Sequence, residues 1–462
     1  MTSLPVALWL TTVFGLPLAC IAIAKTRIGT GRLRLASIAF ASLLTLATTA
    51  PFFWAPLRHF HVYAPAFFPG SGALLRLDEL SLVLPALAAG LWLFTIVATP
   101  TLVLGADGLR FTAHSTLFTL TAFLTEHPLV LAAAWVASTL VVSGSLTTPR
   151  SKKTHAAGTY LAVSSVLFVA GAILLTRAER RGSALELTAL GLLVAGAMIR
   201  KGIFPVHAWV PAMFEHGRLG PAILFSSPQV GTYAVAVLVV PRAPAELLRI
   251  VAVLSLLTGL YAAAQATIQR SVRRVCAYLF VSQSALVMAG LDCTSDEALT
   301  GALVLWIASS VAFAGLGRCI VVLEARRGEL DLSRHHGAYE HKPLLAASFL
   351  VLGLSHSGFP GTLGFVGEEL LLGGAVATFP FLGFLVVASS ALTGIAVLRT
   401  YFALFAGRSR EVPLALRPAE SIAFVAIVFV VIATGLVPSP LVRSRQAAVE
   451  RLFAERTGAT TP

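Results

Sequence analysis

The chain has 462 residues, of which 57% are hydrophobic and only 12% are charged. Soluble domains carry roughly 25% charged residues, so this composition excludes a water-soluble enzyme and predicts an all-α membrane protein. The net charge of +13 could indicate nucleic-acid binding, but Lys and Arg occur in short clusters between apolar runs. That distribution is typical of the loops of membrane proteins, and we expect no nucleic-acid partner.

Apolar runs long enough to cross a bilayer follow one another along the whole chain. They predict about fourteen transmembrane helices in contact with lipid. In chain order the predicted helices cover residues 4–24, 34–54, 80–104, 112–126, 128–146, 157–177, 185–204, 219–240, 245–267, 275–291, 297–323, 343–373, 380–406 and 421–441.

The charges between these helices predict an orientation, because Lys and Arg are enriched in cytoplasmic loops. Five of the predicted cytoplasmic loops are basic, the first being Lys25–Arg34 and the last Arg408–Arg417, whereas the acidic residues Asp292, Asp296 and Glu297 fall on the opposite side. One loop, Arg177–Arg181, disagrees with this pattern. We predict a multi-pass protein of the inner (cytoplasmic) membrane, with both termini outside the cytoplasm.

Two predicted helices are interrupted by the same dipeptide, Phe204-Pro205 and Phe359-Pro360, and a basic residue (Lys201 or His356) stands four positions before each proline. Proline breaks the helical hydrogen-bond ladder, and matched breaks are the sequence sign of repeats in transporters. Chance is the alternative, since the chain has 24 prolines. The matched breaks predict two inverted five-helix repeats. The chain then divides into a three-helix segment (1–110), a first repeat (111–243), a second repeat (244–408) and a C-terminal helix with a tail (409–462).

Ionisable side chains within the predicted spans are candidates for function, because a charge at the bilayer centre costs roughly 2.5–3.5 kcal/mol. Each candidate also has a structural alternative. A long basic side chain can reach the membrane surface, a histidine can be a packing residue, and a glutamate can stabilise a helix N-terminus. The candidates are Arg200, Lys201, His356 and Glu368, with Arg318 and Arg399 as accessory charges.

Several segments are similar to one known family. The stretch Arg200–Pro211, with its Phe-Pro-Val-His-Ala-Trp core, resembles a segment of the antiporter-like subunits of NADH:quinone oxidoreductase (complex I) and of multisubunit Na+/H+ antiporters. Leu77–Ser81, Gln269–Gln283 and Lys342–Glu368 resemble further segments of these subunits in the same order. The resemblance implies fourteen helices, two inverted repeats, a line of buried charges that conducts protons, no redox cofactor in this chain, and partner membrane subunits.

The family's charged positions carry over only in part. Glu368 matches a family glutamate, and Arg200 falls on a family lysine. His207 matches the histidine of the family motif, and we predict that it lies with Trp209 in a polar, non-helical segment on the proton path. Four further relay positions of the family are uncharged in this chain, namely Val136, Gln229, Ala308 and Ala312.

The leading hypothesis is a proton-conducting subunit that couples proton movement to a partner module. One alternative is the membrane subunit of an inorganic-carbon uptake system with a large soluble partner, and another is a structural paralogue that does not conduct. The identity of the neighbouring genes would distinguish the proton-conducting subunit from the inorganic-carbon uptake subunit. We expect no catalytic or redox site and no metal in this chain. The sequence does not distinguish H+ from Na+ as the transported ion.

Overall fold

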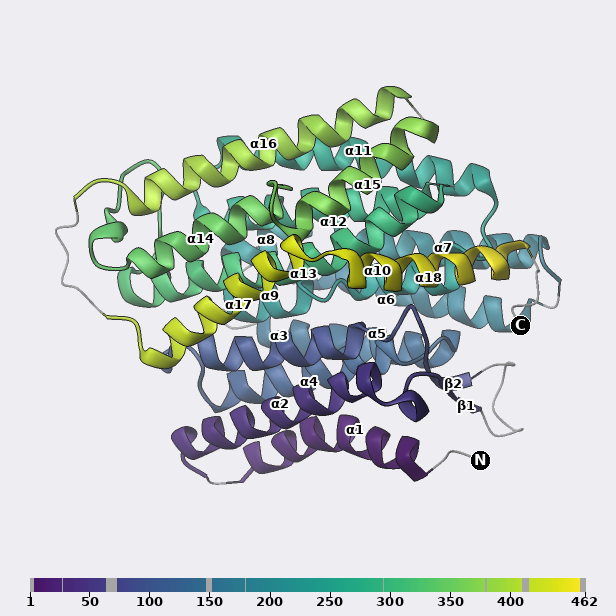
Figure 1. Ribbon diagram of the computed structural model, residues 1–462, viewed down its shortest axis with the longest axis horizontal. Helices are drawn as coiled ribbons and strands as arrows, with labels where there is room; N and C mark the ends of the chain where they lie inside the picture. The colour runs from purple at the N-terminus through teal and green to yellow at the C-terminus, as the bar shows by residue number, and fades with distance from the viewer. Residues whose placement is uncertain are drawn as a thin grey trace.

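Long helices run side by side in one direction through the protein (Figure 1). The computed structural model describes residues 4–26, 28–63, 73–146, 152–178, 180–293, 295–378, 380–408 and 415–457. In that part of the chain, ten helices are long and apolar enough to cross a membrane. The predicted all-α membrane class is confirmed at this level, whereas the predicted count of about fourteen spans includes helices that are shorter or more polar.

The helices agree with most of the predicted ranges to within a few residues. In chain order they are α1 (Leu4–Ala24), α2 (Thr30–Phe53), α3 (Leu84–Ala98), α4 (Ala106–Phe123), α5 (Pro128–Leu146), α6 (Lys152–Arg177), α7 (Ala184–Lys201), α8 (Trp209–His216), α9 (Leu219–Ser226), α10 (Val230–Ala234), α11 (Ala245–Ile268), α12 (Val272–Asp292), α13 (Asp296–Arg327), α14 (Pro343–His356), α15 (Leu363–Thr378), α16 (Pro380–Phe405), α17 (Pro418–Leu436) and α18 (Ser439–Thr457). A π-helical turn (Val235–Val239) extends α10, and 3-10 turns occupy Ala55–Leu57 and Ala338–Glu340. The strands β1 (Phe60–Tyr63) and β2 (Ala73–Leu77) pair antiparallel.

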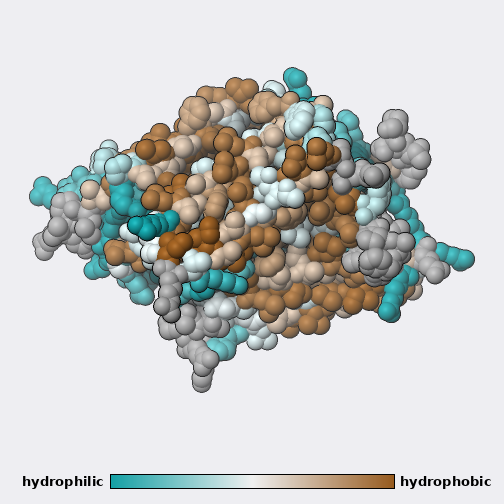
Figure 2. Space-filling view, turned by 90° about the horizontal axis from the view of Figure 1, so that it is seen from below, coloured by the Kyte–Doolittle hydropathy of each residue, from teal (hydrophilic) through white to brown (hydrophobic). Residues whose placement is uncertain are grey.

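The outer surface carries the apolar side chains that a membrane requires. Leu18, Leu43 and Leu46 of α1 and α2 are exposed, and these helices form the lower edge of Figure 1. Figure 2 shows that face from below as a broad hydrophobic band between two hydrophilic ends. α12 and α13, by contrast, are buried along almost their whole length. Only such interior helices can hold charged groups away from lipid.

The predicted continuous helix 219–240 is wrong, because it breaks between α9 and α10. Pro228 has no amide proton to donate, and Gln229 takes a left-handed conformation with φ 50°. The Trp306 indole donates to the carbonyl oxygen of Pro228 at 3.0 Å, which satisfies one of the backbone groups released by the break. Pro228 was the sequence signal for this interruption.

The predicted C-terminal tail is instead a second helix, α18, which runs along α13 toward the side of the bundle that holds β1 and β2 (Figure 1). The buried Arg445 guanidinium donates to the carbonyl oxygen of Leu80 at 2.8 Å. Arg451 forms ion pairs with Asp78 and, at 2.9 Å, with Glu126. These contacts fix α18 against the start of α3 and the connection between α4 and α5.

Candidate functional site

Besides the break at Pro228, the backbone leaves the helical conformation at two further places inside the helix bundle. α7 ends at Lys201, and Gly202 follows with a φ of 72°. The Trp209 indole of α8 donates back to the carbonyl oxygen of Ile199 at 2.7 Å, so the two helices stay together across the interruption. α14 ends in the same way at His356, and Gly358 has a φ of 71°.

Lys201 lies at the first interruption and is only 2% exposed. Its ammonium group donates to the Gln229 side-chain oxygen at 3.1 Å and to the Thr232 hydroxyl. The Gln229 amide nitrogen donates in turn to the Ser309 hydroxyl at 3.0 Å. The Lys201 side chain therefore does not reach the membrane surface, and a polar chain connects it with α13.

Arg200 is buried beside Lys201 but has different partners. Its guanidinium donates to the hydroxyls of Ser138 and Thr139 at 2.7 and 3.2 Å. The guanidinium carbon lies 4.4 Å from the ring centroids of both Trp135 and Phe225. This is a cation–π arrangement, and because an arginine does not release its proton in proteins, Arg200 can act as a fixed charge.

Asp292 was missed as a site residue, because the sequence placed it in a loop. It is the last residue of α12 and is 1% exposed. Neither of its carboxylate oxygens has a hydrogen-bond partner among the described residues, and its charge interacts with that of Lys201. A buried carboxylate without hydrogen bonds is costly, and the charge of Lys201 lowers that cost from a distance, since no ion pair joins the two groups among the described residues.

Glu368 of α15 is the second buried acid. One carboxylate oxygen accepts from the Gln283 amide at 3.1 Å, and the other accepts from the Ser390 hydroxyl at 2.8 Å. Gly358 lies directly against this carboxylate, where any side chain would overlap it. The break after α14 thus leaves room for Glu368.

α12 touches both interruptions and lies between them. Two adjacent residues of α12 make these contacts: the Gln283 amide donates to Glu368, and the Ser284 hydroxyl lies 3.5 Å from the backbone carbonyl oxygen of Lys201. A cavity of about 10 Å³ is lined by residues that include Lys201, Gln229 and Ser284, and a space of this size is close to the minimum for one water molecule. α12 therefore contacts the backbone at Lys201 and the carboxylate of Glu368, and the cavity adjoins the Lys201 side.

His356 also contacts α12. Its Nε2 lies 3.1 Å from the carbonyl oxygen of Leu279, one turn before Gln283, and its Nδ1 has no hydrogen-bond partner among the described residues. Its ring packs 5.8 Å from that of Phe313. Both the packing role and the functional role proposed from the sequence fit this geometry.

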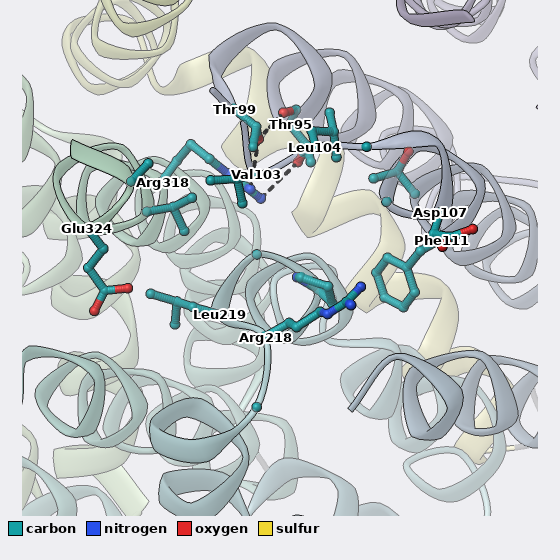
Figure 3. A pocket seen from close by; sticks show the side chains of 18 of the residues that line it. Thr95, Thr99, Val103, Leu104, Asp107, Phe111, Arg218, Leu219, Arg318 and Glu324 are labelled. Carbon is teal, nitrogen blue, oxygen red and sulfur yellow. Dashed lines mark hydrogen bonds between the residues drawn. The ribbon is translucent and has the colours of Figure 1, made fainter. Parts of the chain in front are cut away.

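The other predicted site residues lie outside this cluster. His207 is half-buried, with its ring 5.1 Å from that of Tyr261, so its described neighbours are aromatic rather than the expected polar groups. Arg399 donates to the Gln269 carbonyl oxygen at 2.9 Å, just beyond the end of α11. Arg318 donates to Thr99 of α3 at 2.9 Å and lines a separate cavity (Figure 3). Among the uncharged relay positions, Ala308 and Ala312 are buried and Val136 is partly buried, whereas Gln229 bonds to Lys201.

Replacing Gly358 with alanine is expected to displace the Glu368 carboxylate, since the added carbon would occupy its place. We expect a lower melting temperature of the purified protein, with about 1–3 kcal/mol lost to backbone strain and a further loss from the clash. The matched control is Gly361→Ala, which meets the same left-handed strain at φ 86° but has open space around it. Equal losses in the two variants would contradict the assigned position of Glu368.

Known proteins share this architecture and part of this sequence. The sequence profile of a family described as NADH:quinone oxidoreductase/Mrp antiporter, TM, matches residues 94–393, more than half of the chain. NADH-quinone oxidoreductase subunit 14 of Thermus thermophilus is 30% identical over 330 residues, which cover 68% of this chain and 74% of that subunit. Subunit 13 of the same organism is 33% identical over 223 residues. That match covers 46% of this chain and about half of the subunit, 47%.

Two solved structures have the same fold over nearly the whole chain. A chain of respiratory complex I from Thermus thermophilus with bound NADH superposes with a TM-score of 0.88 at 23% identity, covering 97% of this chain and 99% of that one. A chain of the Mrp complex from Dietzia sp. DQ12-45-1b superposes with a TM-score of 0.87 at 19% identity, covering 99% of both chains. Both structures are multisubunit membrane complexes.

Proposed function

The chain belongs to the NADH:quinone oxidoreductase/Mrp antiporter family of membrane proteins, and we propose that it conducts protons across the membrane as one subunit of a larger complex. The carrying observation is the position of α12, which contacts Lys201 through Ser284 and Glu368 through Gln283. In the proposal, these two protonatable groups on different helices share one buried polar region around α12. Such a region is what proton transfer through a bilayer requires.

In this proposal, Lys201 and Glu368 bind and release the proton, and Arg200 stays charged beside them. Gln229 orients the Lys201 ammonium group, and a water molecule in the adjoining cavity carries the proton along α12. His356 of α14, which contacts α12 at Leu279, one turn before Gln283, is a third group that can take up a proton. Asp292 supplies the acid that is absent at Val136.

We further propose that α7 with α8, and α14 with α15, are the halves of two broken helices in inverted repeats. Each first half ends at a basic residue, Lys201 or His356, and a glycine with positive φ follows. The start of α1 and the end of α18 lie on the same side of the bundle in Figure 1, which fits an even number of crossings. Partner membrane subunits, and a module that drives or uses the proton flow, complete the complex.

The proposal is tested by replacing Gln283 with leucine in the assembled complex, reconstituted in liposomes that contain a pH-sensitive dye. The change leaves the buried Glu368 carboxylate without one of its two donors, and a lost hydrogen bond to a charged group costs about 1.5–3 kcal/mol. We expect proton flux to fall about tenfold or more. The control is Gln265→Leu, since Gln265 lies on α11 and bonds only to Gln269 among the described residues.

The two variants separate conduction from a purely structural role. A complex that assembles normally with Gln283→Leu and keeps the flux of the wild type would assign the chain a structural role. If neither variant assembles, the substitutions disturb helix packing and say nothing about conduction. The same flux assay on Ser390→Ala, which removes the other hydrogen-bond donor to Glu368, would then decide between a conducting and a structural role.

A further inference from the structure

A second cavity, separate from the Lys201–Glu368 region, opens between α3, α4, α9 and α13 (Figure 3). Its volume is about 650 Å³. Thr99, which lines it, accepts hydrogen bonds on its carbonyl oxygen from Arg34 at 2.6 Å and from Arg417 at 2.8 Å. The cavity therefore lies at the basic end of the bundle, at the level where the helices end.

Arg318 of α13 is the buried charge in this cavity and is 2% exposed. Its guanidinium donates to the hydroxyls of Thr99 at 2.9 Å and Thr95 at 3.4 Å (Figure 3). Both partners are neutral, its Nε has no hydrogen-bond partner, and no ion pair is formed with a described carboxylate. A buried guanidinium needs an anion and more acceptors than two hydroxyls provide.

Two helices begin at the wall of the same cavity. The first turns of α4, at Ala106–Gly108, and of α9, at Leu219–Pro221, line it, and neither N-terminus has a side-chain cap. The first amide groups of a helix have no partner within the helix and, with the helix dipole, favour a bound anion. The helix ends thus add backbone donors to the wall of the cavity, and the first turn of α9 lies next to the Arg318 guanidinium at Gly220.

The acidic side chains that line the cavity are already paired. Glu324 accepts from Arg273 at 2.8 Å, and Asp107 forms an ion pair with Arg110. Arg318 and the exposed Arg218 remain as positive charges whose carboxylate partners do not occur among the described residues. The cavity therefore keeps a positive charge that its own walls do not neutralise.

We propose that this cavity binds a phosphate group, either as inorganic phosphate or as the headgroup of an anionic phospholipid. A tetrahedral oxyanion can accept from the Arg318 guanidinium and from amide groups of both helix ends together. The volume leaves room for substituents beyond the phosphate itself, and the position at the helix ends matches the depth of lipid headgroups. This site is independent of the proposed proton path.

The test measures the melting temperature of the purified full-length protein in nanodiscs. One series adds inorganic phosphate at constant ionic strength to phosphatidylcholine discs, and another replaces part of the phosphatidylcholine with phosphatidylglycerol. We expect at least one series to raise the melting temperature of the wild type. Arg318→Gln is expected to weaken the apparent affinity about tenfold or more, because a charge-assisted contact is lost.

Two further variants keep the test decisive if Arg318→Gln folds poorly. Arg218→Gln changes an exposed side chain of the cavity and is expected to weaken binding severalfold, whereas Arg334→Gln, in an exposed loop outside the cavity, should bind like the wild type. Stabilisation by inorganic phosphate identifies a free-anion site, and stabilisation by phosphatidylglycerol alone identifies a lipid site. No stabilisation in either series, or equal effects of Arg218→Gln and Arg334→Gln, would overturn the proposal.

Discussion

Replacing Glu368 with glutamine is expected to reduce proton flux through this subunit at least a hundredfold. Glutamine keeps the size of the side chain and can still bond to Gln283 and Ser390, which hold the carboxylate at 3.1 and 2.8 Å. It cannot bind and release a proton. Glu368 is the buried acid of α15 that α12 contacts through Gln283. The substitution therefore interrupts the proposed proton path at this position without changing the packing. Flux is measured with a pH-sensitive dye in liposomes containing the assembled complex.

The chain itself provides a matched control. Glu369 is the next residue on α15, and its side chain is exposed, so Glu369→Gln removes the same charge outside the buried region. We expect wild-type flux from Glu369→Gln and normal assembly of both variants. If both lose flux to the same extent, net charge rather than the buried carboxylate is responsible, and the assignment of Glu368 is wrong.

Replacing Lys201 with methionine is expected to have the largest effect on stability. The methionine removes the ammonium group that bonds to Gln229 and Thr232, and it leaves the buried Asp292 without a compensating charge. Each hydrogen bond lost from a buried charged group costs about 1.5–3 kcal/mol. We expect less assembled complex, a clearly lower melting temperature of what remains, and loss of proton flux.

A second substitution distinguishes the lost pair from lost packing. In the double variant Lys201→Met/Asp292→Asn the buried charge of Asp292 is removed as well, so part of the lost stability should return while flux stays low. The control variant is Lys25→Met, which makes the same substitution at an exposed position beyond the end of α1. A double variant no more stable than Lys201→Met alone would show that Asp292 and Lys201 are not coupled.

The sequence alone determined that this is a membrane protein of many helices, and largely where these helices lie. The physical reason is local: apolar runs of bilayer length and the distribution of Lys and Arg are properties of consecutive residues. Pro205 and Pro360 predicted the breaks near Lys201 and His356, because a proline interrupts helical hydrogen bonding locally. Glu368 was identified because placing an acidic side chain within an apolar run costs free energy, which makes such a residue a functional candidate.

Only the tertiary structure decided which of these groups meet. Asp292 looked like a loop residue because it ends an apolar run, and the packing of α12 against its neighbours buries it near Lys201. Gln229 looked like a lost relay position, but the break at Pro228 turns it toward the ammonium group. The bridge through Gln283 and the unpaired charge of Arg318 depend on helices far apart in the chain. Contacts of this kind follow from how side chains point across packed helices, and single-chain patterns do not specify that.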